Sequence, residues 1–491
     1  MEKYILSIDQ GTTSSRAILI DRNGNDVNIA QKEVKCSFPR SGWVEVDALA
    51  IWISVINVVN EVLVNQNITW KNIDSIGITN QRETTVIWDK KTGLPICPAI
   101  VWQSRQSASI CDHYEDKKEF IHERTGLLIN PYFSASKIKF ILQNVPGAYE
   151  RAKKGELLFG TIDSWLIYRM TEGKVHATDV SNASRTMLFN IRTLKWDKEL
   201  CDMFGVPMSM LPKVYPSSFD FGEASFFAKG IRIHGVAGDQ QAALFGQTCF
   251  EVGESKNTYG TGCFMLMNIG DKITLSKSGL LTTIGWQIGD QVVYALEGSV
   301  FIGGAVVQWL RDEMHLIEHS ADSEKMAKEC HDTHGVYVVP AFTGLGTPYW
   351  DDDARGAIFG LTRSSSNKHI VRASLEAIAY QCRDVFEVMK QESHFNLSHL
   401  KVDGGATANG YLMQFQSDIL DTEISLPKCL QTTALGAAYL AGLSSGFFTN
   451  LDHIKSIHES QKNYRPLMTR EEADVRYKGW KKAVEITRLY K

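Results

Sequence analysis

The stretch SIDQGTTSSR, residues 7–16, ends a short apolar run with an acid and continues into a turn of small and hydroxyl residues. The backbone N–H groups and hydroxyls of residues 11–15 suit phosphate oxygens, and the guanidinium of Arg16 adds a fixed charge. The turn is not a Walker loop, because no Lys-Ser/Thr pair follows it. A plain hairpin turn is the alternative interpretation. Asp9 needs an explanation, since a carboxylate repels phosphate directly.

The composition is that of a large globular protein. With 491 residues the chain is too long for one core of ordinary size, so we expect two domains of similar size. Hydrophobic residues make up 44% and charged residues 22%, which argues against disorder. The net charge of −4, without a block of five like charges, gives no support to a nucleic-acid or membrane-surface partner. The apolar runs are short, so we also expect no membrane insertion.

Two features predict a cytoplasmic location. The first strand begins at Tyr4, which leaves no room for a signal peptide. The nine cysteines are scattered without a CxxC pair, as is typical of reduced thiols in a chain of this length.

The order of predicted elements in the first half of the chain recurs in the second half. Residues 4–30 predict a hairpin and a third strand, followed by a helix over 47–66 and a short buried strand over 75–80. Residues 255–271 again predict a strand, a Gly-Thr-Gly turn and a strand. An amphipathic helix and the strand-to-loop segment HLKVDGGATAN, residues 399–409, then repeat the earlier pattern. The resemblance is one of order rather than of identity.

The repeat predicts an α/β fold made of two copies of one unit. We place the boundary near Gly246, which gives an N-terminal domain over 1–246 and a C-terminal domain over 247–491. A cleft between the copies would let the turns at residues 11–13 and 260–262 hold the phosphates of a nucleotide from both sides.

Asp239, Arg82 and Glu83 are the candidates for chemistry on an alcohol. Asp239 follows a short apolar strand and precedes a predicted helix, and open α/β sheets place ligands at such strand ends. A carboxylate there can accept the proton of a hydroxyl that attacks phosphorus, although a helix N-cap is the alternative. Arg82 and Glu83 could bind neighbouring hydroxyls of a polyol as donor and acceptor, or form a solvated salt bridge in a loop.

The motifs DQGTTSSR, GITNQRETT, NASRTMLFN, AGDQQAALFGQ, NTYGTGCFMLMN, FTGLGTPYWD and VDGGATAN together resemble those of the FGGY carbohydrate kinase family. The resemblance runs from the first strand to the last helix. It implies two ribonuclease-H-like domains of the actin and heat-shock chaperone ATPase type, with the active site in the cleft between them. It also implies ATP-dependent phosphorylation of glycerol to sn-glycerol 3-phosphate with Mg²⁺, by a homodimer or homotetramer.

The resemblance assigns roles residue by residue. Asp239 resembles the general base, and Asp9, with Asp239 beside it, resembles the acid that holds the magnesium ion through water. The substrate-binding residues that it implies are Arg82, Glu83, Tyr132, Asp239 and Gln240, with Trp102 and Phe264 as an apolar wall. The nucleotide-binding residues that it implies are Thr12, Thr13, Ser14, Arg16, Thr261, Gly304, Gln308, Gly405 and Asn409. Without the resemblance, the three aromatic residues would be assigned to the core.

Three alternative functions remain. An FGGY kinase for another small polyol or a ketose is the nearest, and the Arg82-Glu83 pair with Tyr132 argues against it by resemblance. A nucleotide-dependent switch of the actin or chaperone kind would keep both Gly-Thr turns without needing Asp239, Arg82 and Glu83. A catalytically inactive binding protein is disfavoured because every expected polar position is filled.

One segment departs from the pattern of regulated relatives. SFFAKGIRIHGVAGD, residues 225–239, is about two residues shorter than the loop that binds fructose 1,6-bisphosphate in those relatives and lacks its glycine pair. That inhibition is therefore in doubt for this chain. His234 lies beside Gly235 of the strand, so we interpret it as a structural residue.

Overall fold

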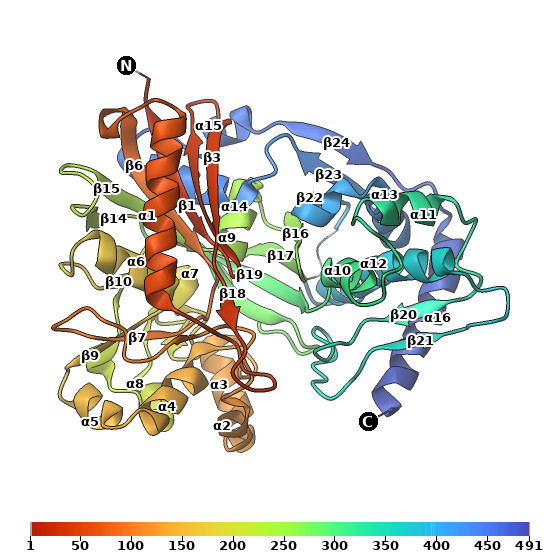
Figure 1. The fold of residues 1–491 in the computed structure, drawn as a ribbon, viewed down its shortest axis with the longest axis horizontal. Helices are drawn as coiled ribbons and strands as arrows, with labels where there is room; N and C mark the ends of the chain where they lie inside the picture. Colours follow the sequence, from red (N-terminus) through yellow and green to blue (C-terminus); the bar gives the residue numbers. More distant parts are fainter. Residues whose placement is uncertain (1, 394, 396, 491) are drawn as a thin grey trace.

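The computed structural model describes residues 2–393, 395 and 397–490, and one sheet of 13 strands runs through both halves of the chain (Figure 1). The N-terminal half contributes, in sheet order, β14 (Ser218–Glu223), β15 (Arg232–Gly238), β6 (Ile73–Asn80), β1 (Tyr4–Gln10), β2 (Ser14–Ile20) and β3 (Asp26–Glu33). The C-terminal half contributes, in the same direction, β24 (Ser460–Tyr464), β23 (Glu423–Pro427), β22 (His399–Asp403), β16 (Ser255–Tyr259), β17 (Cys263–Gly270) and β19 (Gln291–Val300).

The two sets of six strands pair in the same way. In each set three neighbouring strands are parallel, β15-β6-β1 and β23-β22-β16, and the flanking strands are antiparallel. The strand β18 (Leu281–Ile288) links the sets, because it pairs with β19 and meets β14 at Ser218. The predicted repeat of one α/β unit is therefore present in the strand order, and the expected hairpin over 4–30 is confirmed.

In each half, the helix that follows the last of the three parallel strands along the chain packs on strands of the other half. α9 (Asp239–Gly246) follows β15 but packs on β16 and β17, whereas α14 (Thr432–Ser445) follows β23 but packs on β15, β6 and β1. The two helices also contact each other closely, and a Cβ at Gly436 would lie 1.8 Å from the carbonyl oxygen of Ala242. Glycine is required there because no side chain fits between the backbones.

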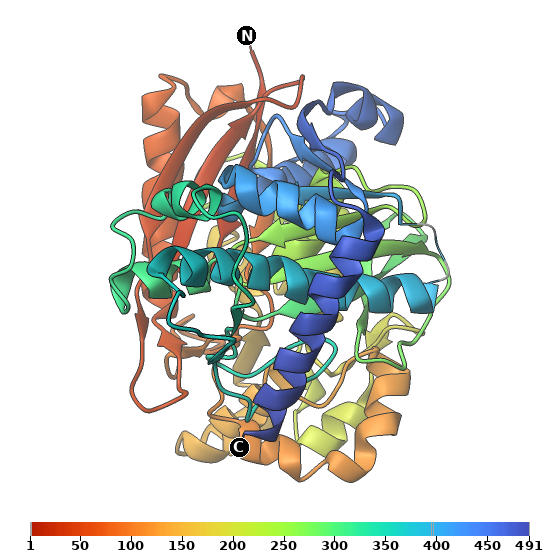
Figure 2. The same cartoon turned by 90° about the vertical axis from the view of Figure 1, so that its right-hand side faces the viewer.

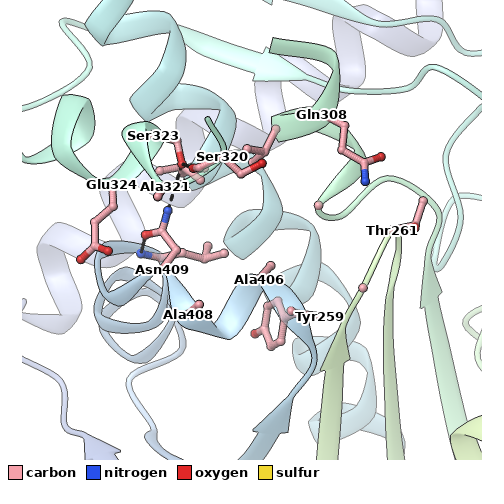
Figure 3. A pocket seen from close by; sticks show the side chains of 16 residues that line it. Tyr259, Thr261, Gln308, Ser320, Ala321, Ser323, Glu324, Ala406, Ala408 and Asn409 are labelled. Carbon is pink, nitrogen blue, oxygen red and sulfur yellow. Dashed lines mark hydrogen bonds between the residues drawn. The ribbon is translucent and has the colours of Figure 1, made fainter. Parts of the chain in front are cut away.

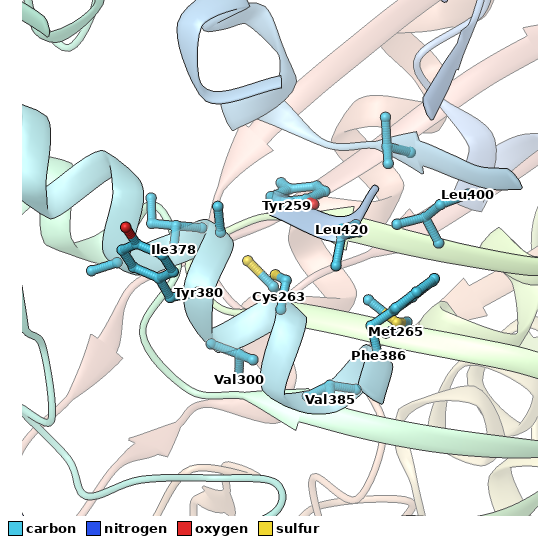
Figure 4. Close-up of a cluster of buried hydrophobic side chains, with 14 of the residues drawn as sticks. Tyr259, Cys263, Met265, Val300, Ile378, Tyr380, Val385, Phe386, Leu400 and Leu420 are labelled. Atoms are coloured by element: carbon cyan, nitrogen blue, oxygen red, sulfur yellow. The ribbon is translucent and has the colours of Figure 1, made fainter. Parts of the chain in front are cut away.

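Other helices cover the outer faces of the sheet. α1 (Ala48–Asn65) and α6 (Ile162–Met170) pack on the N-terminal strands, and Asp47 caps α1 by accepting a hydrogen bond from the N–H of Leu49. In the C-terminal half, α12 (Asn367–Ser393), α13 (Gly410–Leu420) and α16 (Arg470–Leu489) pack together (Figure 2). α12 buries its apolar face on β17 and β19 in a cluster that includes Met265, Val300, Ile378, Val385 and Phe386 (Figure 4).

A lobe with its own apolar core is inserted into the N-terminal half. It contains β7 (Val86–Asp89), α2 (Ala108–Asp112), α3 (Lys118–Thr125), α4 (Ser134–Asn144), α5 (Ala148–Lys153), β9 (Leu157–Gly160) and α8 (Lys198–Phe204). The side chains of Tyr132 and Leu281 belong to this core, so the lobe carries a predicted substrate residue and packs against the linking strand.

The prediction about membrane segments needs correction. By length and composition α1 could cross a membrane, although half of it is buried in the way that a core helix is. The helix itself was predicted over 47–66, but its apolar positions are interrupted by a few polar ones, so its overall hydropathy was not recognised. The boundary at 246–247, which lies at the end of α9, stays a prediction.

Candidate functional site

The two Gly-Thr turns occupy equivalent places at the ends of β1 and β16. In the first, the N–H of Gly11 donates to the carbonyl of Ser14 at 2.9 Å; in the second, the N–H of Gly260 donates to the carbonyl of Gly262 at the same distance. The second turn is also tied to the start of α10 (Ala305–Asp312), because the N–H of Gly304 donates to the carbonyl of Gly260. The remaining N–H and hydroxyl groups of both turns are the kind that bind phosphate oxygens.

A cavity of about 400 Å³ lies between the turns. Every predicted substrate residue lines it, together with four threonines and other residues in or beside the turns. Its lining comprises Thr12, Thr13, Arg82, Glu83, Trp102, Gln103, Tyr132, Asp239, Gln240, Thr258, Gly260, Thr261, Gly262, Phe264 and Gln308. We call it the polyol cavity, after the substrate class that the sequence predicts for these residues. Residues from seven separate segments of the sequence thus meet at one place.

A buried ion network lies beside this cavity. Arg82 donates from its two Nη atoms to both carboxylate oxygens of Glu297, at 2.6 and 2.8 Å, and Arg185 donates to the same carboxylate at 3.1 Å. Arg185 also holds Glu83, with Nε 2.6 Å from Oε1. Burial alone would raise the pKa of Glu297, but the two guanidiniums outweigh it and lower that pKa to about 2. The arginines are thereby kept in one orientation.

Arg82 and Glu83 are not a solvated loop pair. Their exposed fractions are 3% and 1%, and Glu83 has a positive φ of 62°, which is strained for a residue with a side chain. Strain of this kind persists only where the surroundings enforce it and is frequent at functional sites. The Tyr132 hydroxyl accepts from Arg82 Nη2 at 3.2 Å, so the phenol is held at the same wall of the cavity.

Asp239 is the first residue of α9, whereas Gly238 occupies the N-cap position. Its carboxylate pairs with Nε of Arg82 at 3.3 Å, and 28% of its side chain is exposed. Burial raises the pKa of Asp239, and the charges of Arg82 and Lys256 oppose that rise. The helix N-cap interpretation is therefore wrong, because the carboxylate faces the cavity.

Aromatic rings close one side of the polyol cavity. The ring centroid of Trp102 lies 5.5 Å from that of Tyr132 and 6.2 Å from that of Phe264, in edge-to-face contacts. The Trp102 indole also donates to the hydroxyl of Thr12 at 2.9 Å. The Trp102 ring of the predicted apolar wall is thus held to the first Gly-Thr turn.

Asp9 lies at the end of β1, behind the first turn. Its carboxylate is 3.6 Å from Arg16, which stands opposite it on β2. Burial raises the pKa of Asp9 to about 6; Arg16 lowers it, and the charge of Asp239 raises it further. Arg16 itself bonds to Gln31 and Gln431, and neither Arg16, Ser14 nor Asp9 belongs to the lining of the cavities described here.

A second cavity, of about 340 Å³, adjoins the first (Figure 3). Its lining includes the predicted residues Thr261, Gly304, Gln308, Gly405 and Asn409. Asn409 begins α13, where its side chain accepts from the N–H of Leu412 at 2.9 Å and donates to the hydroxyl of Ser323 at 3.2 Å. A Cβ added to Gly405 would meet open space, so the backbone faces the cavity directly. Gly260, Thr261 and Gln308 line both cavities.

Sequence reasoning missed several residues of the site. Arg185 lies in the motif NASRTMLFN, and a lone basic residue among small and apolar ones was an available signal. Glu297 interrupts an otherwise apolar strand, which signals a buried charge that needs a partner. Lys256 is fully buried and donates to Gln240, and burial lowers its pKa to about 8. No local pattern marked it.

Comparison with known proteins gives the family. The N-terminal domain model of the FGGY family of carbohydrate kinases matches residues 4–246, and the C-terminal domain model matches residues 255–445. The chain is 57% identical over 496 residues to a glycerol kinase of Bacillus licheniformis and 56% identical over 494 residues to one of Fusobacterium nucleatum, covering at least 99% of each.

Solved structures agree with this result. The crystal structure of Plasmodium falciparum glycerol kinase with ADP matches 99% of this chain and 98% of its own, with a TM-score of 0.91 and 38% identity. A xylulose kinase from Lactobacillus acidophilus, at 22% identity, has a TM-score of 0.87, covers 99% of this chain and 97% of its own, and shares the fold. The predicted fold class is thereby confirmed, and the chain belongs to the FGGY family of carbohydrate kinases.

Proposed function

We propose that this chain catalyses the ATP-dependent phosphorylation of glycerol to sn-glycerol 3-phosphate. The observation that carries the proposal is the meeting of the two cavities at Gly260, Thr261 and Gln308. A nucleotide in the second cavity would have its γ-phosphate at that boundary, and a polyol in the first cavity would have a hydroxyl there. The relatives at 56–57% identity that are named glycerol kinase support glycerol as the acceptor.

The polyol cavity supports a short substrate with several hydroxyls. Arg82, Glu83 and Tyr132 offer donors and acceptors on one side, and Trp102 and Phe264 form an apolar wall against a carbon backbone. A site built from buried hydrogen-bonding groups rejects an analogue that leaves one of them unpaired. The same aromatic rings occupy the space into which a longer sugar would extend.

Asp239 is the proposed general base. A glycerol hydroxyl oxygen forms a bond to the γ-phosphorus as the bond between that phosphorus and the bridging oxygen of ADP breaks, and the hydroxyl proton passes to the Asp239 carboxylate. The backbone N–H groups of the two turns bind the phosphate oxygens, which keeps the reacting atoms in line. Closure of the two halves around the substrates would exclude water as a competing acceptor.

The acids fit a magnesium ion that is bound mainly by the nucleotide. Among the described residues there is no group of three or more His, Cys, Asp or Glu placed to hold a metal. Asp9 and Asp239, however, are close enough that the charge of one raises the pKa of the other. Mg²⁺ commonly uses one or two carboxylates, several waters and substrate phosphates, and it would neutralise the phosphate charge here. Asp9 would hold it through water, beside Asp239.

The substrate is tested by a coupled ADP-release assay with glycerol, dihydroxyacetone, erythritol, xylitol and ribulose as acceptors, in Mg²⁺ and in EDTA. We expect turnover to depend on Mg²⁺ and to be fastest with glycerol. Strong turnover with a pentulose and none with glycerol would instead identify a ketose kinase of the same family.

The base is tested by Asp239→Asn. We expect kcat to fall by about 10²–10⁴-fold, with ADP binding unchanged by calorimetry. The matched control is Asp384→Asn, which alters another buried carboxylate, held by Tyr477 and Trp480 and not part of the lining of either cavity. That control should lower the melting temperature and leave kcat within a few-fold. Near-normal turnover by Asp239→Asn would remove the proposed role.

The assembly and location predicted from the sequence remain proposals. A homodimer or homotetramer is expected, and light scattering of the purified protein measures it. A cytoplasmic location, without nucleic-acid or membrane partners, stays a prediction that fractionation of cells can check.

A further inference from the structure

Lys256, on β16, lies beneath the polyol cavity. Its side chain is fully buried, and its Nζ donates to Oε1 of Gln240 at 2.5 Å, to Oγ1 of Thr258 at 2.9 Å and to the carbonyl of Phe264 at 3.2 Å. All three acceptors belong to residues that line the cavity, whereas Lys256 does not. An ammonium group has three protons, so every donor of this lysine is committed to the site.

The three acceptors come from both halves of the fold. Gln240 is the second residue of α9 and follows Asp239 directly. Thr258 and Phe264 face each other across the hairpin that carries the turn 260–262. Lys256 therefore ties the start of the helix that bears the proposed base to the turn that would bind the phosphates. Without it, the side-chain carbonyl of the buried Gln240 and the hydroxyl of the half-buried Thr258 would lose their shared donor.

The charge of Lys256 also matters to the site. Glu83, Glu297 and Asp239 carry three negative charges when ionised, and Arg82 and Arg185 supply two positive ones. The Lys256 ammonium adds a further positive charge beneath the cavity, where the charges of Asp403 and Asp239 both act on it. A fixed positive charge in a water-poor site stabilises negative charge that develops on transferring oxygens.

Lys401 offers a comparison within the same sheet. It is the register partner of Lys256 on the neighbouring strand β22. Its Nζ binds the carbonyls of Gln247 and Thr248 at the far end of α9, at 2.9 and 3.1 Å, and Glu254 at 3.1 Å. The two lysines thus hold opposite ends of one helix, and only Lys256 contacts the residues of the polyol cavity.

We propose that Lys256 is a positioning residue for phosphoryl transfer, which holds Gln240 and the start of α9 in register with the turn 260–262. This proposal rests on the proposed function. In it, Lys256 does not contact the substrate but keeps the acceptor hydroxyl, the base and the γ-phosphate in the arrangement that the reaction needs. Misplacement of reacting groups by about 1 Å costs on the order of 10²-fold in rate. Loss of the lysine should therefore affect kcat more than the binding of either substrate.

The test compares Lys256→Met with Lys401→Met. For Lys256→Met we expect kcat with glycerol to fall about 100-fold, with the Kd of ADP by calorimetry within about threefold of that of the unchanged protein. The ratio of ATP hydrolysis to glycerol 3-phosphate formation should rise, because water needs less alignment than glycerol. Lys401→Met should lower the melting temperature similarly and keep kcat within about threefold. A purely structural role predicts equal losses in both variants and would overturn the proposal.

Two further variants keep the test decisive if Lys256→Met does not fold. Gln240→Leu and Thr258→Val each remove one acceptor and retain the lysine. Each should lower kcat several-fold and raise the same hydrolysis ratio, and kcat and ratios that match the unchanged protein would contradict the proposal. In a folded background, the double variant Lys256→Met/Gln240→Leu should lose no more than Lys256→Met alone, since both act through one contact. Absence of glycerol turnover in the unchanged protein would instead overturn the proposed function.

Discussion

The turns at 11–13 and 260–262 share a backbone design and differ in what surrounds them. Asp9 stands two residues before the first glycine of its turn, and Thr258 stands two residues before the other. Asp9 faces Arg16 across its hairpin, whereas Thr258 faces Phe264. Two residues earlier, on the same face of each strand, Ser7 of β1 corresponds to Lys256 of β16.

The difference shows how a repeated fold becomes an asymmetric site. Ser7 anchors α14 by donating to the carbonyl of Ala434 at 2.7 Å, and Lys256 anchors the start of α9 through Gln240. The repeat places the two Gly-Thr turns on either side of a cavity. The residues that differ between the two copies make the site asymmetric: Asp9 lies beside the first turn, and Lys256 lies beneath the second. The following predictions test this division, from the largest expected effect to the smallest.

The first concerns Glu297, the carboxylate from the C-terminal half on which Arg82 and Arg185 of the N-terminal half converge. Glu297→Gln removes one of the two carboxylates that the adjacent guanidiniums of Arg82 and Arg185 share, and leaves only Glu83 between them. Removing one member of a buried ion pair costs about 3–5 kcal/mol. We expect a large fall in the urea midpoint and a raised KM for glycerol. An unchanged midpoint would show that the halves do not depend on this contact.

The second concerns the acid of the first turn. Asp9→Asn should lower kcat/KM for Mg²⁺-ATP by about 100-fold, as loss of a residue that orients a metal site does. Thr258→Val, at the equivalent place, should cost less than about tenfold. Because burial raises the pKa of Asp9 to about 6, its ionised form destabilises the free protein at pH 7. The melting temperature of Asp9→Asn should therefore not fall. Equal kinetic losses in both variants would contradict the asymmetry.

The third concerns pH. His176 packs edge-to-face against Trp88, its Nε2 lies 2.7 Å from the carbonyl oxygen of Phe159, and burial lowers its pKa to about 4. The unfolded chain has the ordinary pKa of about 6.5 and binds a proton first, so this histidine's contribution to stability is lost as the pH falls from 6.5 towards 4. We expect His176→Gln to remove about 2 kcal/mol of that acid sensitivity. Urea midpoints at pH 7, 5.5 and 4.5 measure it, and parallel curves for both proteins would refute it.

The smallest effect is expected at an exposed contact between the halves. Arg105 and Asp352 form an ion pair of 2.9 Å, with side chains 41% and 29% exposed. Exposed pairs contribute about 0.2–1 kcal/mol and are weakened by salt. A double-mutant cycle with alanine at both positions should give a coupling energy below about 1 kcal/mol that vanishes at high salt. A coupling energy as large as the stability loss expected for Glu297→Gln would show that this exposed pair matters as much as the buried ion network.

Much of the fold and of the site follows from short segments. The hairpin over 4–30, the helix capped by Asp47 and the helix begun by Asn409 depend on turn chemistry, apolar periodicity and capping, which act over a few residues. Asp239, Arg82 and Glu83 could be predicted from the sequence because each follows a buried strand, and parallel sheets gather polar groups at one edge. The motif resemblance added the aromatic wall and the nucleotide residues.

The sequence by itself therefore determined the repeated unit, the two Gly-Thr turns and the polar residues at the strand ends. Tertiary structure decided which charges meet: Glu297 with Arg82 and Arg185, and Lys256 with Gln240. These partners are separated by 16 to 215 residues along the chain. Tertiary structure also decided that α9 and α14 each pack on strands of the other half. The physical reason is that burying a charge requires a partner, and only the packed chain determines which partner lies within reach.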